Sequence, residues 1–146
     1  MFYNVEKTTE RSDKMPQSEK RNEIIRVFRK YARLGLDSER LCPIQIYKKI
    51  DILCISRRAR LDMFAVYDTL RLLTLNGESQ IVDAIRRVYF EGKAYRLTKY
   101  DISSRVLFLA QREHCDERTV YRRLERARNL YEKVRQNEGL VTDDIF

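Results

Sequence analysis

Apolar residues recur at helical spacing along most of this chain. After Ser18, apolar side chains fall at intervals of three and four residues from Ile24 to Leu34, and Gly35 follows as a helix stop. Because an α-helix turns once every 3.6 residues, this spacing gathers the apolar side chains on one face. The pattern predicts a first helix over residues 18–34.

A second apolar stripe starts at Pro43, whose missing N–H costs nothing in the first turn of a helix. Apolar residues then recur from Ile46 to Leu73, and periodicity alone does not decide whether one helix or two covers this run. The stretch Ser-Arg-Arg-Ala-Arg at residues 56–60 interrupts the apolar pattern. We therefore expect two helices, with a break near these residues.

The dipeptide Asn76-Gly77 ends the long apolar run, because Gly after Asn is typical of a tight turn. Another helical stripe then extends from Ile81 to Tyr89. Gly92 follows it, and glycine is the residue that helices most often use as a stop. The pattern predicts a helix between these two glycines.

Two more helices are marked by residues that cap helix N-termini. Thr98 with Asp101 three residues later resembles a capping box, which opens a helix that we expect to end near Glu113. Asp116 is a good N-cap for a final helix that reaches about Gln136. The apolar stripe of that helix consists of Val120, Leu124, Ala127, Tyr131 and Val134.

The composition agrees with an all-helical chain. Four Gly and two Pro among 146 residues are too few for the turns of a protein built from many short strands. No apolar run is long enough to span a membrane, and no leader pattern opens the chain. We therefore predict an all-α fold, a helical bundle, with no membrane partner.

The three cysteines, Cys42, Cys54 and Cys115, are an odd number and include no C-x-x-C pair. This spacing favours neither a disulfide framework nor a zinc knuckle. We expect reduced thiols and a cytoplasmic protein.

The last two predicted helices are joined by only about three residues, Glu113 to Cys115, so the second helix must turn sharply across the first. Ala110 is small where the two helices would cross, and Cys115 is an apolar plug in the turn. Turn length, small crossing residue and cap together indicate a C-terminal helix-turn-helix, a DNA-binding motif.

With its apolar stripe facing inward, the final helix carries Arg118, Tyr121 and Arg122 on its outer face, with Arg126 beside them. An Arg side chain can donate two hydrogen bonds to the major-groove edge of guanine, and Tyr121 can reach a phosphate or a base methyl group. These four are therefore the candidate base-reading residues. The candidate phosphate contacts are Thr119, Lys93, Arg96, Lys99 and Arg105. A charged helix face is also common on helices that bind nothing but water.

The stretch HCDERTVYRRLERARNLYEKV at residues 114–134, preceded by IVDAIRRVYF and KYDISSRVLFLAQRE, resembles the C-terminal helix-turn-helix domain of bacterial sigma factors. It is also similar to the sigma-like transcription activators of phages and prophages of Gram-positive bacteria. The resemblance covers about residues 79–136. His114 stands in the turn where Gly is usual, at a position that favours positive φ.

The resemblance implies a bacterial, nucleoid-associated DNA-binding protein that acts on transcription. It implies that Arg118, Thr119, Tyr121 and Arg122 approach duplex DNA. Residues 18–75 match no family that we recognise and lack the other domains of a sigma factor, so a complete sigma factor is not implied. These N-terminal helices are left with three roles: a homodimer surface, a contact with RNA polymerase, or completion of the core.

The charge balance keeps a second interpretation open. The chain has 30 basic and 22 acidic residues, a net charge of +8, but residues 101–146 hold 9 of each and are neutral overall. A protein-interaction module is therefore the alternative, in which the basic helix docks on RNA polymerase or another acidic partner with little DNA binding. Without the acidic tail, residues 99–136 hold 10 basic and 6 acidic residues, or +4, which favours DNA.

Catalysis is not indicated. The single His114 has no second His or Cys ligand in reach except the adjacent Cys115, and no glycine-rich phosphate loop occurs. We expect no enzyme activity, no metal and no cofactor. The predicted organisation is a mobile arm over residues 1–16, an N-terminal helical region over 17–76, the helix-turn-helix region over 77–137 and a loose acidic tail over 138–146.

Overall fold

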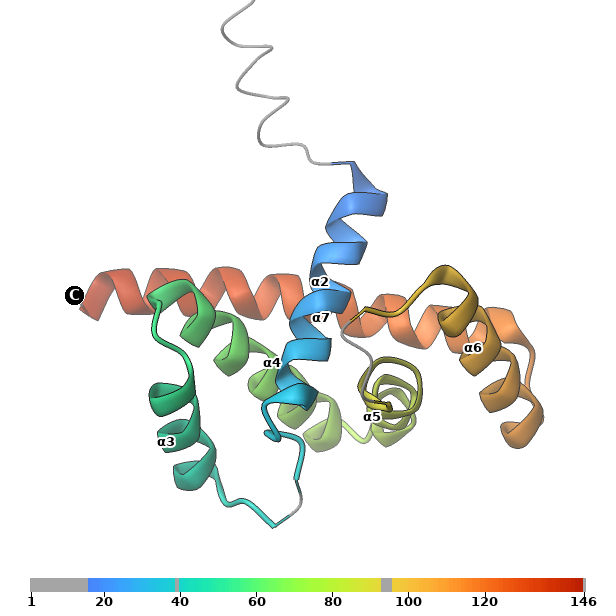
Figure 1. Ribbon diagram of the computed structural model, residues 1–146, viewed down its shortest axis with the longest axis horizontal. Coiled ribbons are helices and arrows are strands. Elements are labelled where there is room, and N and C mark those ends of the chain that lie inside the picture. The colour runs from blue at the N-terminus through green and yellow to red at the C-terminus, as the bar shows by residue number, and fades with distance from the viewer. Residues whose placement is uncertain (1–15, 39, 93–95, 146) are drawn as a thin grey trace, which may run out of the picture.

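A computed structural model describes residues 16–38, 40–92 and 96–145 of the chain (Figure 1). Helices make up most of the described residues, with no strand among them, which confirms the all-α prediction. The elements are α2 (Gln17–Arg33), α3 (Pro43–Leu53), α4 (Arg57–Leu75), α5 (Ser79–Ile85), the π-helical segment η1 (Arg86–Phe90), α6 (Lys99–Glu113) and α7 (Glu117–Ile145).

The helix boundaries follow the local signals of the sequence. The first helix stops before Gly35, whose φ of 71° only glycine adopts without strain. The long apolar run is broken just ahead of residues 56–60, where the Ser56 hydroxyl accepts a hydrogen bond of 3.1 Å from the Ala59 N–H and caps α4. Pro43 is the first residue of α3, as predicted.

Two predictions at the chain ends have different outcomes. The final helix continues to Ile145, so its predicted end near Gln136 and the loose tail over residues 138–146 are wrong as far as residue 145. A glycine inside a helix costs only about 1 kcal/mol, and no proline follows Gly139 to stop the helix. The predicted mobile arm lies outside the described residues, apart from Pro16.

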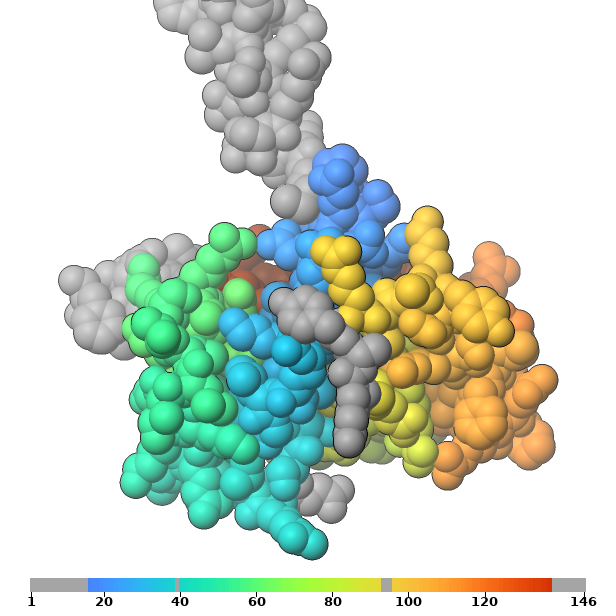
Figure 2. Space-filling view, in the orientation of Figure 1, coloured from blue at the N-terminus to red at the C-terminus, as the bar shows by residue number. Residues whose placement is uncertain are grey.

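Helix α7 runs along the length of the molecule, and α2 crosses it in the view of Figure 1. Helices α4, α5 and α6 pack against α7, and α2 packs against η1 and α4. In the space-filling view, α2 lies between α3 and α4 on one side and α6 on the other (Figure 2). Residues of the predicted regions 17–76 and 77–137 therefore share one buried cluster, and the N-terminal helices complete the core.

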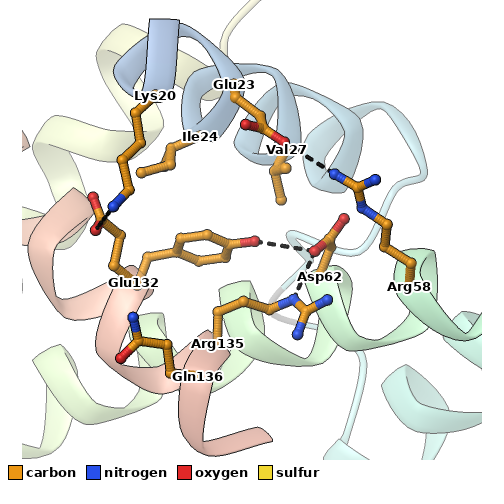
Figure 3. Close-up of a pocket in the computed structure, with 10 residues that line it drawn as sticks. Lys20, Glu23, Ile24, Val27, Arg58, Asp62, Glu132, Arg135 and Gln136 are labelled. Atoms are coloured by element: carbon orange, nitrogen blue, oxygen red, sulfur yellow. Dashed lines mark hydrogen bonds and ion pairs between the residues drawn. The ribbon is translucent and has the colours of Figure 1, made fainter. Parts of the chain in front are cut away.

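Aromatic rings join the two halves of this core. Phe28 of α2 stacks on Tyr89 with ring centroids 5.8 Å apart, and it meets the ring of Tyr131 edge-on at 5.4 Å. The Tyr131 hydroxyl donates to the Asp62 carboxylate at 3.4 Å, and Arg135 pairs with the same carboxylate at 2.8 Å. Figure 3 shows the pair of Asp62 and Arg135 where α2, α4 and α7 meet.

The most buried charge of the described residues belongs to Arg29 of α2, which is 2% exposed. Its Nη1 donates to the backbone carbonyls of Tyr89, Phe90 and Glu91 at 3.0, 3.1 and 2.9 Å, and its Nη2 donates to the Gly92 carbonyl at 3.3 Å. The last carbonyls of a helix have no partner within that helix. Arg29 therefore supplies from α2 the donors that the end of η1 lacks.

Burial, and next the positive charge of Arg105, lowers the pKa of Arg29. The ordinary pKa of arginine is so high that the group remains a cation at neutral pH. Removal of a buried cation leaves the carbonyls that it bound without hydrogen-bond donors. The resulting loss of folding free energy is larger than the contribution of one ordinary hydrogen bond.

We predict that Arg29→Met lowers the free energy of unfolding by about 3 kcal/mol or more, because buried carbonyls lose charged donors while the apolar stem is kept. Urea denaturation of the purified proteins measures this. Arg26→Met is the matched control, since Arg26 is exposed on the same helix, and its effect should stay within about 0.5 kcal/mol. Equal stability of the two variants would show that the end of η1 does not depend on Arg29.

Candidate nucleic-acid interface

Helices α6 and α7 are joined by residues 114–116 alone. Helix α6 begins with the predicted capping box: the Thr98 hydroxyl accepts from the Asp101 N–H at 3.1 Å, and the Asp101 carboxylate accepts from the Thr98 N–H at 2.9 Å. The helix ends at Glu113, also as predicted. Because the link is so short, the end of α6 fixes where α7 must start.

The turn contains a left-handed residue. His114 has φ 56° and ψ 42°, and it is the non-glycine residue with positive φ in the described part of the chain. Directly after it, the Cys115 N–H donates to the Ala110 carbonyl at 3.0 Å, a bond that closes the end of α6. The positive φ predicted for the usual glycine position is confirmed.

Asp116 caps α7. Its Oδ1 accepts from the Thr119 N–H at 3.2 Å and from the Thr119 hydroxyl at 2.7 Å, and these hydrogen bonds lower the pKa of Asp116. The Thr119 hydroxyl is thus committed to the cap. The phosphate contact of Thr119 stays a prediction, and its hydroxyl donor already has a carboxylate partner inside the protein.

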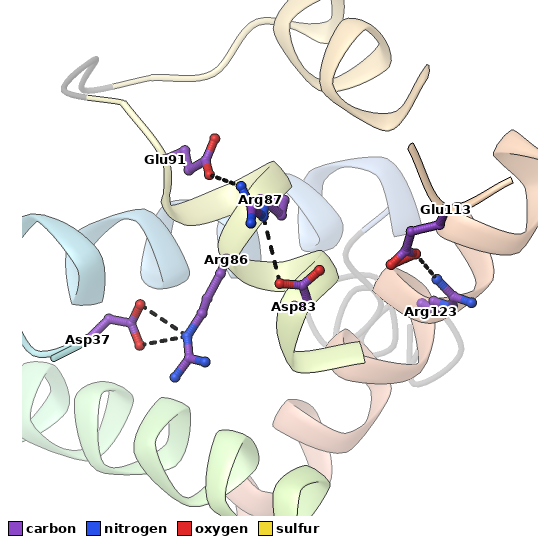
Figure 4. Close-up of polar contacts among 7 residues, drawn as sticks. All are labelled: Asp37, Asp83, Arg86, Arg87, Glu91, Glu113 and Arg123. Carbon is purple, nitrogen blue, oxygen red and sulfur yellow. Dashed lines mark hydrogen bonds and ion pairs between the residues drawn. The ribbon is translucent and has the colours of Figure 1, made fainter. Parts of the chain in front are cut away.

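A partly buried ion pair links the two helices. Arg123 Nη1 lies 2.6 Å from Glu113 Oε2, which ties the second turn of α7 to the last residue of α6 (Figure 4). Behind this pair, Ala110, Val120 and Leu124 are buried in the common core. The sequence did not reveal the Arg123–Glu113 pair, since ten positions separate the two residues and Arg123 stands in a run of basic residues.

Arg118, Tyr121 and Arg122 lie together on the outer face of α7. All three are exposed, with Tyr121 at 41%, and neither arginine forms an ion pair with another described residue. They are spaced three and four positions apart, so they project from the same side of the first two turns. These three predicted base-reading residues are brought together as a set of free donors.

The fourth, Arg126, is engaged elsewhere. Its Nε and Nη2 bind both carboxylate oxygens of Glu78 at 2.9 and 2.8 Å, an arrangement that raises the pKa of Arg126 and lowers that of Glu78. Arg126 therefore links α7 to the start of α5. Its role as a base-reading residue stays a prediction, with two of its three guanidinium nitrogens already bound to Glu78.

The other predicted phosphate contacts differ in how exposed they are. Arg96 and Lys99 are exposed at the start of α6, whereas Lys93 lies outside the described residues. Arg105 is half-buried, and its Nη1 donates to the Val88 carbonyl at 2.9 Å. A Cβ atom added to Gly92 would lie 2.8 Å from Arg105 Nη2, so the guanidinium packs closely against this glycine. Arg105 therefore binds the backbone of η1, and its role as a phosphate contact stays a prediction.

Comparison of this chain with protein-family models, curated proteins and solved structures found no match. Within residues 16–38, 40–92 and 96–145, no helix has the length and apolar character needed to cross a membrane. The same residues contain no group of three or more His, Cys, Asp or Glu side chains able to hold a metal ion.

We predict that His114→Gly raises the free energy of unfolding by about 0.5–1 kcal/mol, because glycine adopts positive φ without the steric cost that a Cβ atom brings. His114→Val should lower it, since a β-branched side chain resists that conformation. Chemical denaturation of both variants beside the wild type is the measurement. Shifts of the same sign for Gly and Val would contradict a backbone origin.

The cap of α7 predicts a pH dependence. The folded-state pKa of Asp116 is depressed, so its stabilising effect is complete above the unfolded-state pKa and is lost as the pH falls through the folded-state pKa. Asp116→Asn keeps a good N-cap that does not titrate. Melting temperatures from pH 6 to about pH 2.5 should therefore fall less steeply for Asp116→Asn than for the wild type. Parallel curves would mean that the carboxylate charge contributes nothing.

Proposed function

We propose that this protein is a sequence-specific duplex-DNA-binding transcription regulator, with α6 and α7 acting as a helix-turn-helix. The observation that carries the proposal is the outer face of α7, where Arg118, Tyr121 and Arg122 are exposed and the two arginines have no ion-pair partner among the described residues. The other side of the same helix is buried in the core, which holds this face rigidly. A reading surface needs both properties.

Base reading and backbone binding are assigned to different residues. The major groove of B-DNA admits an α-helix, where Arg118 and Arg122 donate pairs of hydrogen bonds to guanine and Tyr121 contacts a base methyl group or a phosphate. Arg96 and Lys99, at the start of α6, bind phosphate oxygens and set the register of the helix on the duplex. The phosphate contacts supply affinity for any sequence, and the base contacts supply preference.

The action on transcription rests on the resemblance of residues 79–136 to the helix-turn-helix domains of sigma factors and of phage and prophage activators. In this proposal the protein works in the bacterial cytoplasm at the nucleoid. RNA polymerase and a second copy of this chain are its further candidate partners, because regulators of this kind act next to polymerase or on two-fold DNA sites.

A second candidate function is a protein-interaction module. Exposed apolar side chains on α6 favour it: Tyr100 is 79% exposed and Phe108 is 66% exposed, with Leu107 beside it. Such residues suit a protein partner better than a phosphate backbone. In this alternative α7 docks its basic face on an acidic partner and binds DNA weakly.

We predict that Arg118→Ala and Arg122→Ala each cost about 1–3 kcal/mol of binding free energy on the preferred site and relax base preference there. Selection from a pool of random duplexes, followed by fluorescence anisotropy on the enriched site and on a scrambled one, measures both effects. Arg71→Ala is the matched control, because Arg71 is exposed on α4 and is not part of the candidate interface.

Two results would overturn the proposal in different ways. Equal losses on the enriched and scrambled duplexes would make Arg118 and Arg122 phosphate contacts, and sequence reading would have to lie elsewhere. Absence of wild-type binding to any duplex at low salt would favour the protein-interaction module.

A further inference from the structure

A groove of about 620 Å³ lies between α2, α6 and α7. Arg21 and Asn22 of the N-terminal half of α2 line it, as do Lys99 and Tyr100 at the start of α6. Its volume is in the range of ligand-binding clefts in proteins. The sequence left this part of α2 with three candidate roles, none of them DNA binding, and nothing in the helical pattern of residues 17–33 placed it beside the final helix.

The groove is basic. Arg21, Lys99 and Arg128 line it against a single acidic side chain, Glu125, which leaves a net charge of +2. Arg21 and Lys99 are exposed and form no ion pair with other described residues. Two uncompensated cations that line one groove repel each other, and an anion bound in the groove relieves that repulsion.

The third cation is fixed in place. Arg128 Nη1 donates to the Tyr89 hydroxyl at 2.7 Å, so the guanidinium is held at the inner wall without a carboxylate to neutralise it. Burial raises the pKa of Tyr89, so the phenol stays protonated and neutral at physiological pH. The positive charge of Arg128 therefore remains available to an anionic ligand.

The groove is continuous with the candidate base-reading face. Tyr121 lines the groove and also lies on the outer face of α7, next to Arg122 and one turn from Arg118. Tyr121 therefore joins the candidate base-reading face to the groove that Arg21 and Lys99 also line. In a duplex, the chemistry that flanks a groove edge is a row of phosphodiesters.

We propose that this groove seats the sugar–phosphate backbone of one DNA strand, with Arg21 of α2 and Lys99 of α6 as the phosphate contacts that line it. The inference rests on the proposed DNA-binding function and adds α2 to the interface. It gives the N-terminal half of α2, from Gln17 to Ile25, a role beyond packing, because this half stands beside the final helix as a second wall for the strand.

A free nucleotide offers the same phosphate chemistry, but the groove is not built as a cradle for one phosphate. Such cradles use unpaired backbone N–H groups at a helix N-terminus. At the start of α6, Thr98 and Asp101 already fill that position with their capping box. Cations spread over separate walls fit a chain of phosphates better than a single compact anion.

The test is the salt dependence of duplex binding. Each phosphate contact contributes about −0.9 to the slope of log K against log salt concentration, so Arg21→Ala should reduce the slope by about one contact. The affinity of Arg21→Ala for the enriched duplex and for the scrambled duplex should fall by a similar factor, so that its base preference is kept. Lys99→Ala should reduce the slope by the same amount. Arg21→Lys should keep the wild-type slope, because it keeps the positive charge at this position.

Controls separate this inference from the proposed function. Arg71→Ala, on a helix that does not line the groove, should keep the wild-type slope, and circular dichroism verifies the fold of every variant. No wild-type binding to duplex would overturn the proposed function together with the inference. Duplex binding by the wild type with unchanged slopes in Arg21→Ala and Lys99→Ala would overturn the inference alone.

A second arm distinguishes the source of the phosphate. Adenosine and guanosine monophosphates are titrated up to millimolar concentration against the wild type and Arg21→Ala. Weak or absent binding to both proteins is expected. Binding of a mononucleotide at micromolar concentration that Arg21→Ala abolishes, with the duplex slope unchanged, would make the groove a nucleotide site and overturn the backbone assignment.

Discussion

The packing of the helices in this protein depends on one buried cation that binds the backbone carbonyls at the end of a helical segment. Arg29 reaches from α2 to four consecutive backbone carbonyls at the end of η1. A π-helical segment widens the turn and displaces its last carbonyls from the pattern of an α-helix. The guanidinium has enough donors, in a planar fork, to bind several oxygens at once, which a lysine ammonium cannot match in this geometry.

This interaction decides where the candidate interface lies. Because Arg29 anchors α2 to η1, the N-terminal half of α2 is held beside α6 and α7, where Arg21 and Lys99 line one groove. Arg105 of α6 donates to the Val88 carbonyl, so two arginines from different helices hold the same segment. The exposed face of α7 is therefore supported by the whole bundle and not only by its partner helix α6.

Much of the fold could be predicted because its signals are local. Thr98 with Asp101, Asp116 and Pro43 each act within four residues, and the position of His114 in the turn predicted its positive φ. The roles of individual arginines could not be predicted in the same way. In the sequence Arg29, Arg105 and Arg126 look like any other basic surface residue, and their partners are up to 63 positions away. The continuation of α7 past Gly139 was not predicted, because a glycine is a strong local signal for a helix end. Here the helix-forming residues around Gly139 outweigh that signal.

The division of labour along α7 has an evolutionary consequence. Its inward residues hold the core, while Arg118, Tyr121 and Arg122 project outward, and no ion pair within the described chain depends on the two arginines. Substitutions of the two exposed arginines remove no buried contact of the bundle. Under the proposed function, descendants of this chain can therefore acquire new target sites by drift at the reading face alone, without first passing through poorly folded intermediates.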